Sequence, residues 1–132
     1  MSRYFLLIIF MLNLIHKKLE VYHISLQLIK EIYLLTNKFP PVEKFILSSQ
    51  IKIAAISVCS NIAEGSVRIS DLDKKRFYEI ARSSLVEVET QIEIAFELSY
   101  LSENDILHAN ELIESVFKML SKLISKLANK TS

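Results

Sequence analysis

The chain has 132 residues, the length of one ordinary domain, and 51% of them are hydrophobic. One glycine and two prolines are too few for the turns of a β-sandwich or barrel, and phosphate-binding loops need several glycines. The single cysteine excludes a disulfide framework and a thiolate-rich zinc site, and a formal net charge of +1 gives no overall basic signal for nucleic acid.

The apolar content is high for so small a chain, with a mean hydropathy of +0.30. Because a soluble monomer needs a more polar surface, partner subunits or a membrane must cover the excess. The composition therefore indicates an all-α, cytoplasmic protein that forms oligomers.

The chain begins with an apolar run over residues 4–12, which is too short to span a bilayer as a helix. Arg3 before this run resembles the start of a signal peptide, but no cleavage site of small residues follows. We therefore treat residues 1–13 as an apolar N-terminal extension, with Met11 as an alternative start of the protein. Residues 14–132 are expected to form one four-helix bundle domain.

Hydrophobic residues recur at helical spacing in four segments of this domain. The predicted helices span about residues 14–37, 42–64, 71–100 and 103–129. Gly65 follows the second helix, where we expect a left-handed cap, and Ser70 and Ser102 are each followed by Asp at the spacing of an N-cap. Because the links are short, we expect an antiparallel up-down-up-down four-helix bundle.

Apolar stripes predict which side of each helix faces the core. The first helix has two, one through Tyr22 and Tyr33 and one through Leu28 and Ile32, which suggests burial on more than one side. The second helix has a single stripe that contains Leu47, Ile51, Ala54, Ala55, Val58 and Ile62.

Charge is distributed unevenly along the chain. Residues 83–117 contain eight acidic residues and no Lys or Arg. In an antiparallel bundle, the start of the first helix, the second link and the end of the fourth helix meet at one end. That end, which we call the basic end, gathers Lys17, Lys18, Arg68, Lys74, Lys75, Arg76, Lys126 and Lys130. It is a candidate phosphate-binding surface; the alternative is simple solvation, because basic residues favour helix C-termini and exposed faces.

Catalytic and metal sites find little support in the sequence. Glu20 and His23 have the Glu-x-x-His spacing of di-iron bundles, and Asp105 and His108 approximate it, but the two pairs fall at opposite ends of the predicted bundle. Cys59 lies in an apolar helix, where a buried, unreactive thiol is expected. We therefore predict no catalytic residues, no metal site and no cofactor.

Asn61 and Glu64 are polar residues near the end of an otherwise apolar helix. Buried polar groups need partners, so this pair indicates either a functional site or an internal hydrogen-bond network. In the second interpretation the partners are Glu87, Glu89 or Gln91.

Two segments resemble a known family. Residues 57–65, SVCSNIAEG, resemble the SIPSNIAEG segment of the four-helix bundle proteins called 23S rRNA-intervening sequence proteins, and residues 84–91, SLVEVETQ, resemble their SLxELETQ segment. The resemblance covers about residues 14–127. Cys59 stands where the family usually has proline. Ile53 stands where a basic residue is common, which weakens the nucleic-acid prediction.

The resemblance implies an antiparallel four-helix bundle that often forms a homopentamer, and no catalytic residues come with the family. A relative, the accessory variability determinant protein of diversity-generating retroelements, binds nucleic acid and works with a reverse transcriptase. We therefore expect a non-enzymatic homo-oligomer that binds RNA or DNA through its basic end, with a reverse transcriptase as a candidate protein partner. The alternatives are a protein-assembly module that binds no nucleic acid and, less favoured, a membrane-associated protein held by residues 4–15.

Overall fold

The computed structural model describes residues 19–131, with side chains over residues 19–128. The elements of this part of the chain are α2 (Glu20–Thr36), the short 3-10 helix η2 (Pro41–Glu43), α3 (Leu47–Val67), α4 (Asp71–Glu97) and α5 (Glu103–Thr131). No strand occurs within these residues, so the prediction of an all-α fold with four main helices is confirmed. The predicted extension over residues 1–13 lies outside the described residues.

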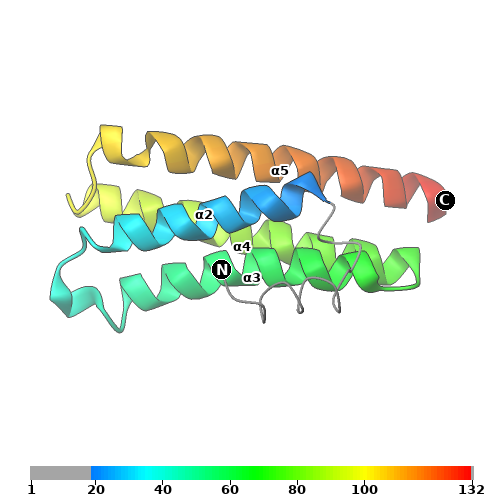
Figure 1. Cartoon of the computed structure of the whole chain (residues 1–132), viewed down its shortest axis with the longest axis horizontal. Helices are drawn as coiled ribbons and strands as arrows, with labels where there is room; N and C mark the ends of the chain where they lie inside the picture. The colour runs from blue at the N-terminus through cyan, green and yellow to red at the C-terminus, as the bar shows by residue number, and fades with distance from the viewer. Residues whose placement is uncertain (1–18, 132) are drawn as a thin grey trace, which may run out of the picture.

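The four α-helices lie side by side in a bundle (Figure 1). α3 packs most extensively against α4, α4 packs against α5, and α2 packs against both α3 and α5. Among these residues α2 and α4 make no such contact, so they occupy diagonal corners of the bundle. Figure 1 shows the chain reversing direction at each link, which is consistent with the expected antiparallel order.

Both predicted serine caps are confirmed. The Asp73 backbone N–H donates to Ser70 Oγ at 3.1 Å at the start of α4. At the start of α5 the Asp105 N–H donates to Ser102 Oγ at 3.2 Å, while the Ser102 N–H donates to Asp105 Oδ2 at 2.8 Å. These bonds satisfy N–H groups that have no partner within a helix.

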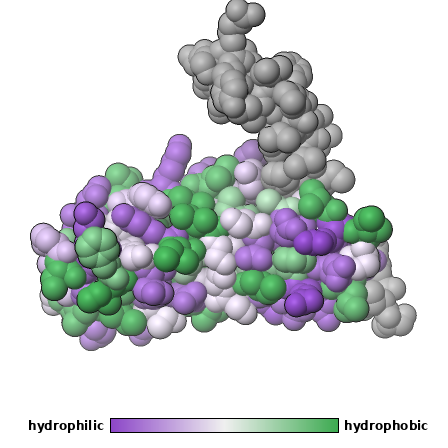
Figure 2. Space-filling view, turned by 90° about the horizontal axis from the view of Figure 1, so that it is seen from below, coloured by the Kyte–Doolittle hydropathy of each residue, from purple (hydrophilic) through white to green (hydrophobic). Residues whose placement is uncertain are grey.

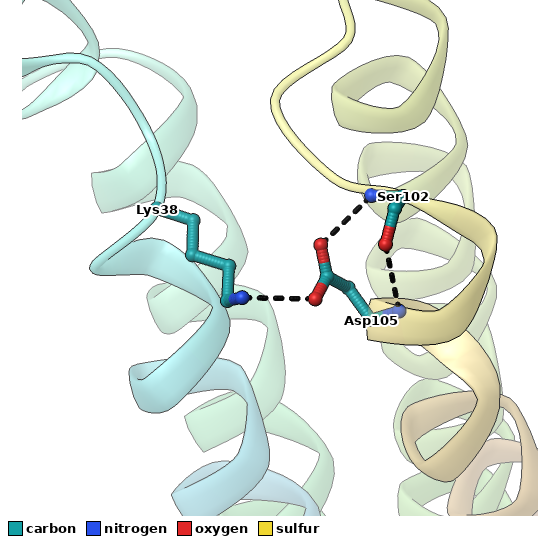
Figure 3. A network of polar contacts seen from close by, with 3 residues as sticks. All are labelled: Lys38, Ser102 and Asp105. Carbon is teal, nitrogen blue, oxygen red and sulfur yellow. Dashed lines mark hydrogen bonds and ion pairs between the residues drawn. The ribbon is translucent and has the colours of Figure 1, made fainter.

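Asp105 also connects two parts of the chain that are far apart in the sequence. Its Oδ1 accepts from Lys38 Nζ at 2.9 Å, so the end of α2 is held against the start of α5 (Figure 3). Hydrogen bonds from the Ser102 backbone and from Lys38 lower the pKa of Asp105 to about 2. At the same end, Tyr100 Oη donates to Glu43 Oε2 at 2.8 Å. We call the end that carries the α2–α3 and α4–α5 links, with Lys38, Glu43, Tyr100 and Asp105, the link end. It lies opposite the basic end.

The core follows the predicted stripes in most places. Every residue of the predicted α3 stripe is buried. In α2 the stripe through Leu28 and Ile32 faces the core, and both side chains are fully buried. Tyr22 and Ile29 of the other stripe are half-buried and pack against the same core. Tyr33 of the other stripe is 43% exposed. The second stripe is therefore divided between the core and the surface, because Leu26 and Tyr33 face outward. Burial on more than one side of α2 holds only in part within this subunit.

The predicted start of α3 at residue 42 is wrong by five residues. The chain first makes the η2 turn, in which the Lys44 N–H donates to Pro41 O at 3.1 Å. Ile46 then takes non-helical backbone angles, φ −118° and ψ −98°, so α3 begins at Leu47. Proline fits the first turn of any helix, so Pro41 alone does not show whether a short 3-10 turn or a long α-helix follows it.

The predicted left-handed cap at Gly65 is also wrong. Gly65 lies inside α3 with a negative φ, and the helix continues to Val67 with Arg68 as its cap. A Cβ at position 65 would stand 2.9 Å from the Tyr78 ring and 3.1 Å from Phe77 Cβ. Glycine is therefore needed because α4 crosses close to α3 at this point.

A left-handed residue does occur at a helix end, but at the end of α4. Ser99 has a φ of 64°, and the Tyr100 N–H donates to Ala95 O at 2.9 Å. This bond spans five residues and closes the helix at Glu97 in a Schellman-type cap. The predicted continuation of α4 to residue 100 is thus wrong by three residues.

Candidate nucleic-acid interface

The link between α3 and α4 and the end of α5 lie together at the basic end of the bundle (Figure 1). Arg82 of α4 connects this helix directly to α5, because its Nη1 donates to Ser121 Oγ at 3.1 Å. Its guanidinium also lies 5.8 Å from the centre of the Phe117 ring. The candidate residues whose side chains are described here are Arg68, Lys74, Lys75, Arg76 and Lys126. Lys17, Lys18 and the side chain of Lys130 lie outside the described part.

Two of these candidates hold the link between α3 and α4. Arg68 forms an ion pair with Glu64 one turn earlier, and its guanidinium lies 4.6 Å from the centre of the Phe77 ring. Lys74 Nζ donates to Ser66 O at 2.9 Å, which satisfies a carbonyl in the last turn of α3. These two cations are committed to the fold, so they are weaker candidates for phosphate contacts.

The other candidates are available at the surface. Arg76 and Lys126 are exposed, Lys75 is partly exposed, and no ion pair holds any of the three within the described residues. Lys122, which was not among the predicted site residues, is also exposed and lines a shallow hollow with Lys126 and Glu20. The signal for Lys122 was the recurrence of lysine at every fourth residue along the fourth helix.

Acidic side chains at this end only partly offset the basic ones. Asp71 and Asp73 occupy the first turn of α4, where a carboxylate complements the helix dipole. Glu64 is already paired with Arg68. The unpaired cations come from both α4 and α5, so the end presents positive charge over more than one helix.

The internal polar network exists with different partners from those predicted. Asn61 Nδ2 donates to Ser57 O at 2.8 Å and to Ser57 Oγ at 3.1 Å. Ser57 Oγ in turn lies 2.9 Å from Ser84 Oγ, so the chain of hydrogen bonds crosses from α3 to α4. The partner on α4 is therefore a serine at the contact, and Glu64 is absent from the network because it pairs with Arg68.

Glu87, Glu89 and Gln91 make no hydrogen bond to Asn61 within the described structure. Glu87 and Glu89 are exposed, because a carboxylate left in water avoids the desolvation cost that burial would impose. Gln91 is half-buried, and its Oε1 has no partner there. The prediction of these three residues as network partners is wrong.

The remaining candidate chemistry is sparse. Cys59 is buried, as expected, and burial raises the pKa of its thiol. Within residues 19–131 no three His, Cys, Asp or Glu side chains gather where a metal ion could be held. None of the described helices has the length and apolar character to cross a membrane.

A comparison with curated proteins finds no match. A family model described as 23S rRNA-intervening sequence protein matches residues 17–122, from the start of α2 to the later turns of α5. The match includes the α3–α4 contact with its Ser57–Ser84 bond, and also the link at the basic end. Since it extends over most of the sequence, the chain belongs to the 23S rRNA-intervening sequence protein family.

Proposed function

We propose that this protein is a non-enzymatic, cytoplasmic homo-oligomer, a pentamer by its family resemblance, that binds RNA or DNA. Each subunit is an antiparallel up-down-up-down bundle that offers its basic end to the nucleic acid. The observation that supports this most is the position of four accessible cations, two on α4 and two on α5, at one end: Lys75, Arg76, Lys122 and Lys126.

The character of these residues favours phosphate contacts over base recognition. Lysine and arginine bind phosphates through charge, and that part of the affinity falls steeply with salt and is independent of sequence. Base stacking needs accessible aromatic rings, but Tyr78 is buried and Phe77 lies under the Arg68 guanidinium. Several copies in one particle would multiply the basic surface and raise the affinity by avidity.

The test is to reverse the two α4 cations that the fold does not use. Lys75→Glu combined with Arg76→Glu leaves Lys74 to cap α3 and should weaken binding to mixed-sequence RNA and DNA by about tenfold or more at low salt. The plot of log affinity against log salt should become less steep, with a slope smaller in magnitude by about two, close to one for each lost phosphate contact. Fluorescence anisotropy at several salt concentrations measures both quantities.

Lys44→Glu is the matched control, because Lys44 is an exposed lysine beside η2 at the link end. It should leave the affinity and the salt slope unchanged, while light scattering checks that neither variant alters the size of the particle. Equal binding by wild type and by the Lys75/Arg76 variant would contradict the assignment of this surface. Binding of neither RNA nor DNA by the wild type would favour the protein-assembly alternative.

A further inference from the structure

Outward-facing residues near the end of α2 form an exposed surface that is both apolar and basic. Tyr33 and Leu34 are 43% and 62% exposed, and with Ile29, Lys30 and Asn37 they line a shallow hollow. Lys52 of α3 reaches this surface, because its Nζ lies 4.8 Å from the centre of the Tyr33 ring. We call Lys30, Tyr33, Leu34 and Lys52 the α2 face; it contains two cations and no carboxylate.

The outward side of α4 forms a surface of the opposite charge. Ile94 and Leu98 are 43% and 51% exposed, and with Thr90, Glu93 and Glu97 they line another shallow hollow. Glu93 and Glu97 are exposed, one helical turn apart. We call Glu93, Ile94, Glu97 and Leu98 the α4 face; it contains two carboxylates and no cation.

The two faces lie on opposite sides of the subunit at the same end. α2 and α4 occupy diagonal corners of the bundle, and each face lies opposite the buried stripe of its own helix. The α2 face lies on the last two turns of α2 and the second turn of α3, and the α4 face lies at the end of α4. Both are therefore at the end of the bundle where the Lys38–Asp105 ion pair holds the end of α2 against the start of α5. The charges therefore cannot neutralise each other within one subunit.

Exposed hydrophobic side chains extend over the link end as well. Figure 2 shows them gathered at the left, the end that carries the link from α2 to α3. Val42, Phe45 and Ile46 of this link are all more than half exposed. Apolar surface of this extent is typical of a protein interface.

We propose that the α2 face of one copy binds the α4 face of a second copy. Lysines then meet glutamates around apolar side chains, whereas a contact of α2 with α2 or of α4 with α4 would place like charges opposite each other. The contact uses two different surfaces of each subunit, so it is heterologous and repeats from copy to copy into a ring or a filament. This inference rests on the homo-oligomer of the proposed function and adds where its subunits meet.

Charge reversal on each face tests the contact. The first variant carries Lys30→Glu and Lys52→Glu, the second carries Glu93→Lys and Glu97→Lys, and the third carries all four changes. Glu111→Lys, on an exposed residue of α5 outside both faces, is the matched control. Light scattering gives the particle mass at one fixed protein concentration, and circular dichroism checks that each variant keeps its helices.

The first and second variants should fall to the subunit mass of 15.2 kDa, because like charges then oppose each other at every contact. The third variant should assemble again, since both faces have exchanged their charge, and the control should keep the wild-type mass. Assembly of the first two variants, or a folded but monomeric third variant, would overturn the interface alone. A wild-type protein that is monomeric throughout would overturn the homo-oligomer of the proposed function as well.

Discussion

Gly65 provides a sharp test of how closely α3 and α4 pack. In an exposed helix interior, Gly→Ala stabilises by about 1 kcal/mol because alanine loses less backbone entropy on folding. At position 65 a new Cβ would stand 2.9 Å from the ring of Tyr78, which is buried. Overpacking of a buried site costs about 1–3 kcal/mol, so we expect Gly65→Ala to be destabilising by up to about 2 kcal/mol.

A second substitution isolates the cause. Tyr78→Leu removes Cε1 of the ring, the atom nearest to the new Cβ, whereas Phe77 Cβ remains at 3.1 Å, so in that background Gly65→Ala should be less destabilising than in the wild type. The coupling energy between the two substitutions is then about 1 kcal/mol or more, although Tyr78→Leu is itself destabilising. Ala63→Gly, two residues away in the same helix, should cost about 1 kcal/mol in both backgrounds and calibrates the helix propensity.

Urea unfolding at one fixed protein concentration measures all these variants, since the stability of an oligomer depends on concentration. The reasoning fails if Gly65→Ala stabilises the wild type by about 1 kcal/mol, the value for an unhindered helix position. It also fails if the effect of Gly65→Ala is the same with and without the Tyr78 ring.

Two further substitutions test the hydrogen bonds. Ser57→Ala removes the hydroxyl that links α3 to α4 and should lower the free energy of unfolding by about 1 kcal/mol, whereas Ser60→Ala, at an exposed position of α3, should change it by less than about 0.5 kcal/mol. Equal urea midpoints for the two variants would argue against the hydrogen bond. The pKa of Asp105 is lowered from 3.8 to about 2 by hydrogen bonds from the Ser102 backbone and Lys38, so its contribution to stability is present above about pH 4 and is lost as the pH falls through 2. Asp105→Asn should therefore flatten the loss of stability over that range, and an acid profile identical to that of the wild type would refute the assignment.

Local signals in the sequence were sufficient for most of the fold. The caps at Ser70 and Ser102 depend on a side chain and a backbone N–H three residues later, so the residues themselves carry the information. The α3 stripe was predictable for the same reason, because burial follows helical spacing. The left-handed Ser99 was not predictable, since serine carries no preference for positive φ and the cap depends on how the α4–α5 link leaves the helix.

Tertiary contacts decide what local signals leave open. A glycine after an apolar stripe is typical of a helix cap, but at Gly65 the close approach of α4 requires it instead. The topology placed the cations at the basic end, yet spacing cannot show that Arg68 pairs with Glu64 or that Lys74 caps α3. Asn61 is likewise connected to α4 through the Ser57 hydroxyl, because the carboxylates expected as its partners are exposed to water.

The net charge of the chain is small, but its charges are placed so that they favour contacts between copies. The two lysines of the α2 face and the two glutamates of the α4 face cancel in the net charge, yet they lie on opposite sides of the bundle and cannot pair within one subunit. In a ring closed by such contacts, rotation about one axis relates all copies, so every basic end has the same direction along that axis. In a ring whose bundles stand along that axis, Arg76 and Lys126 of each copy would lie on one side, where several copies can contact one phosphate backbone at once.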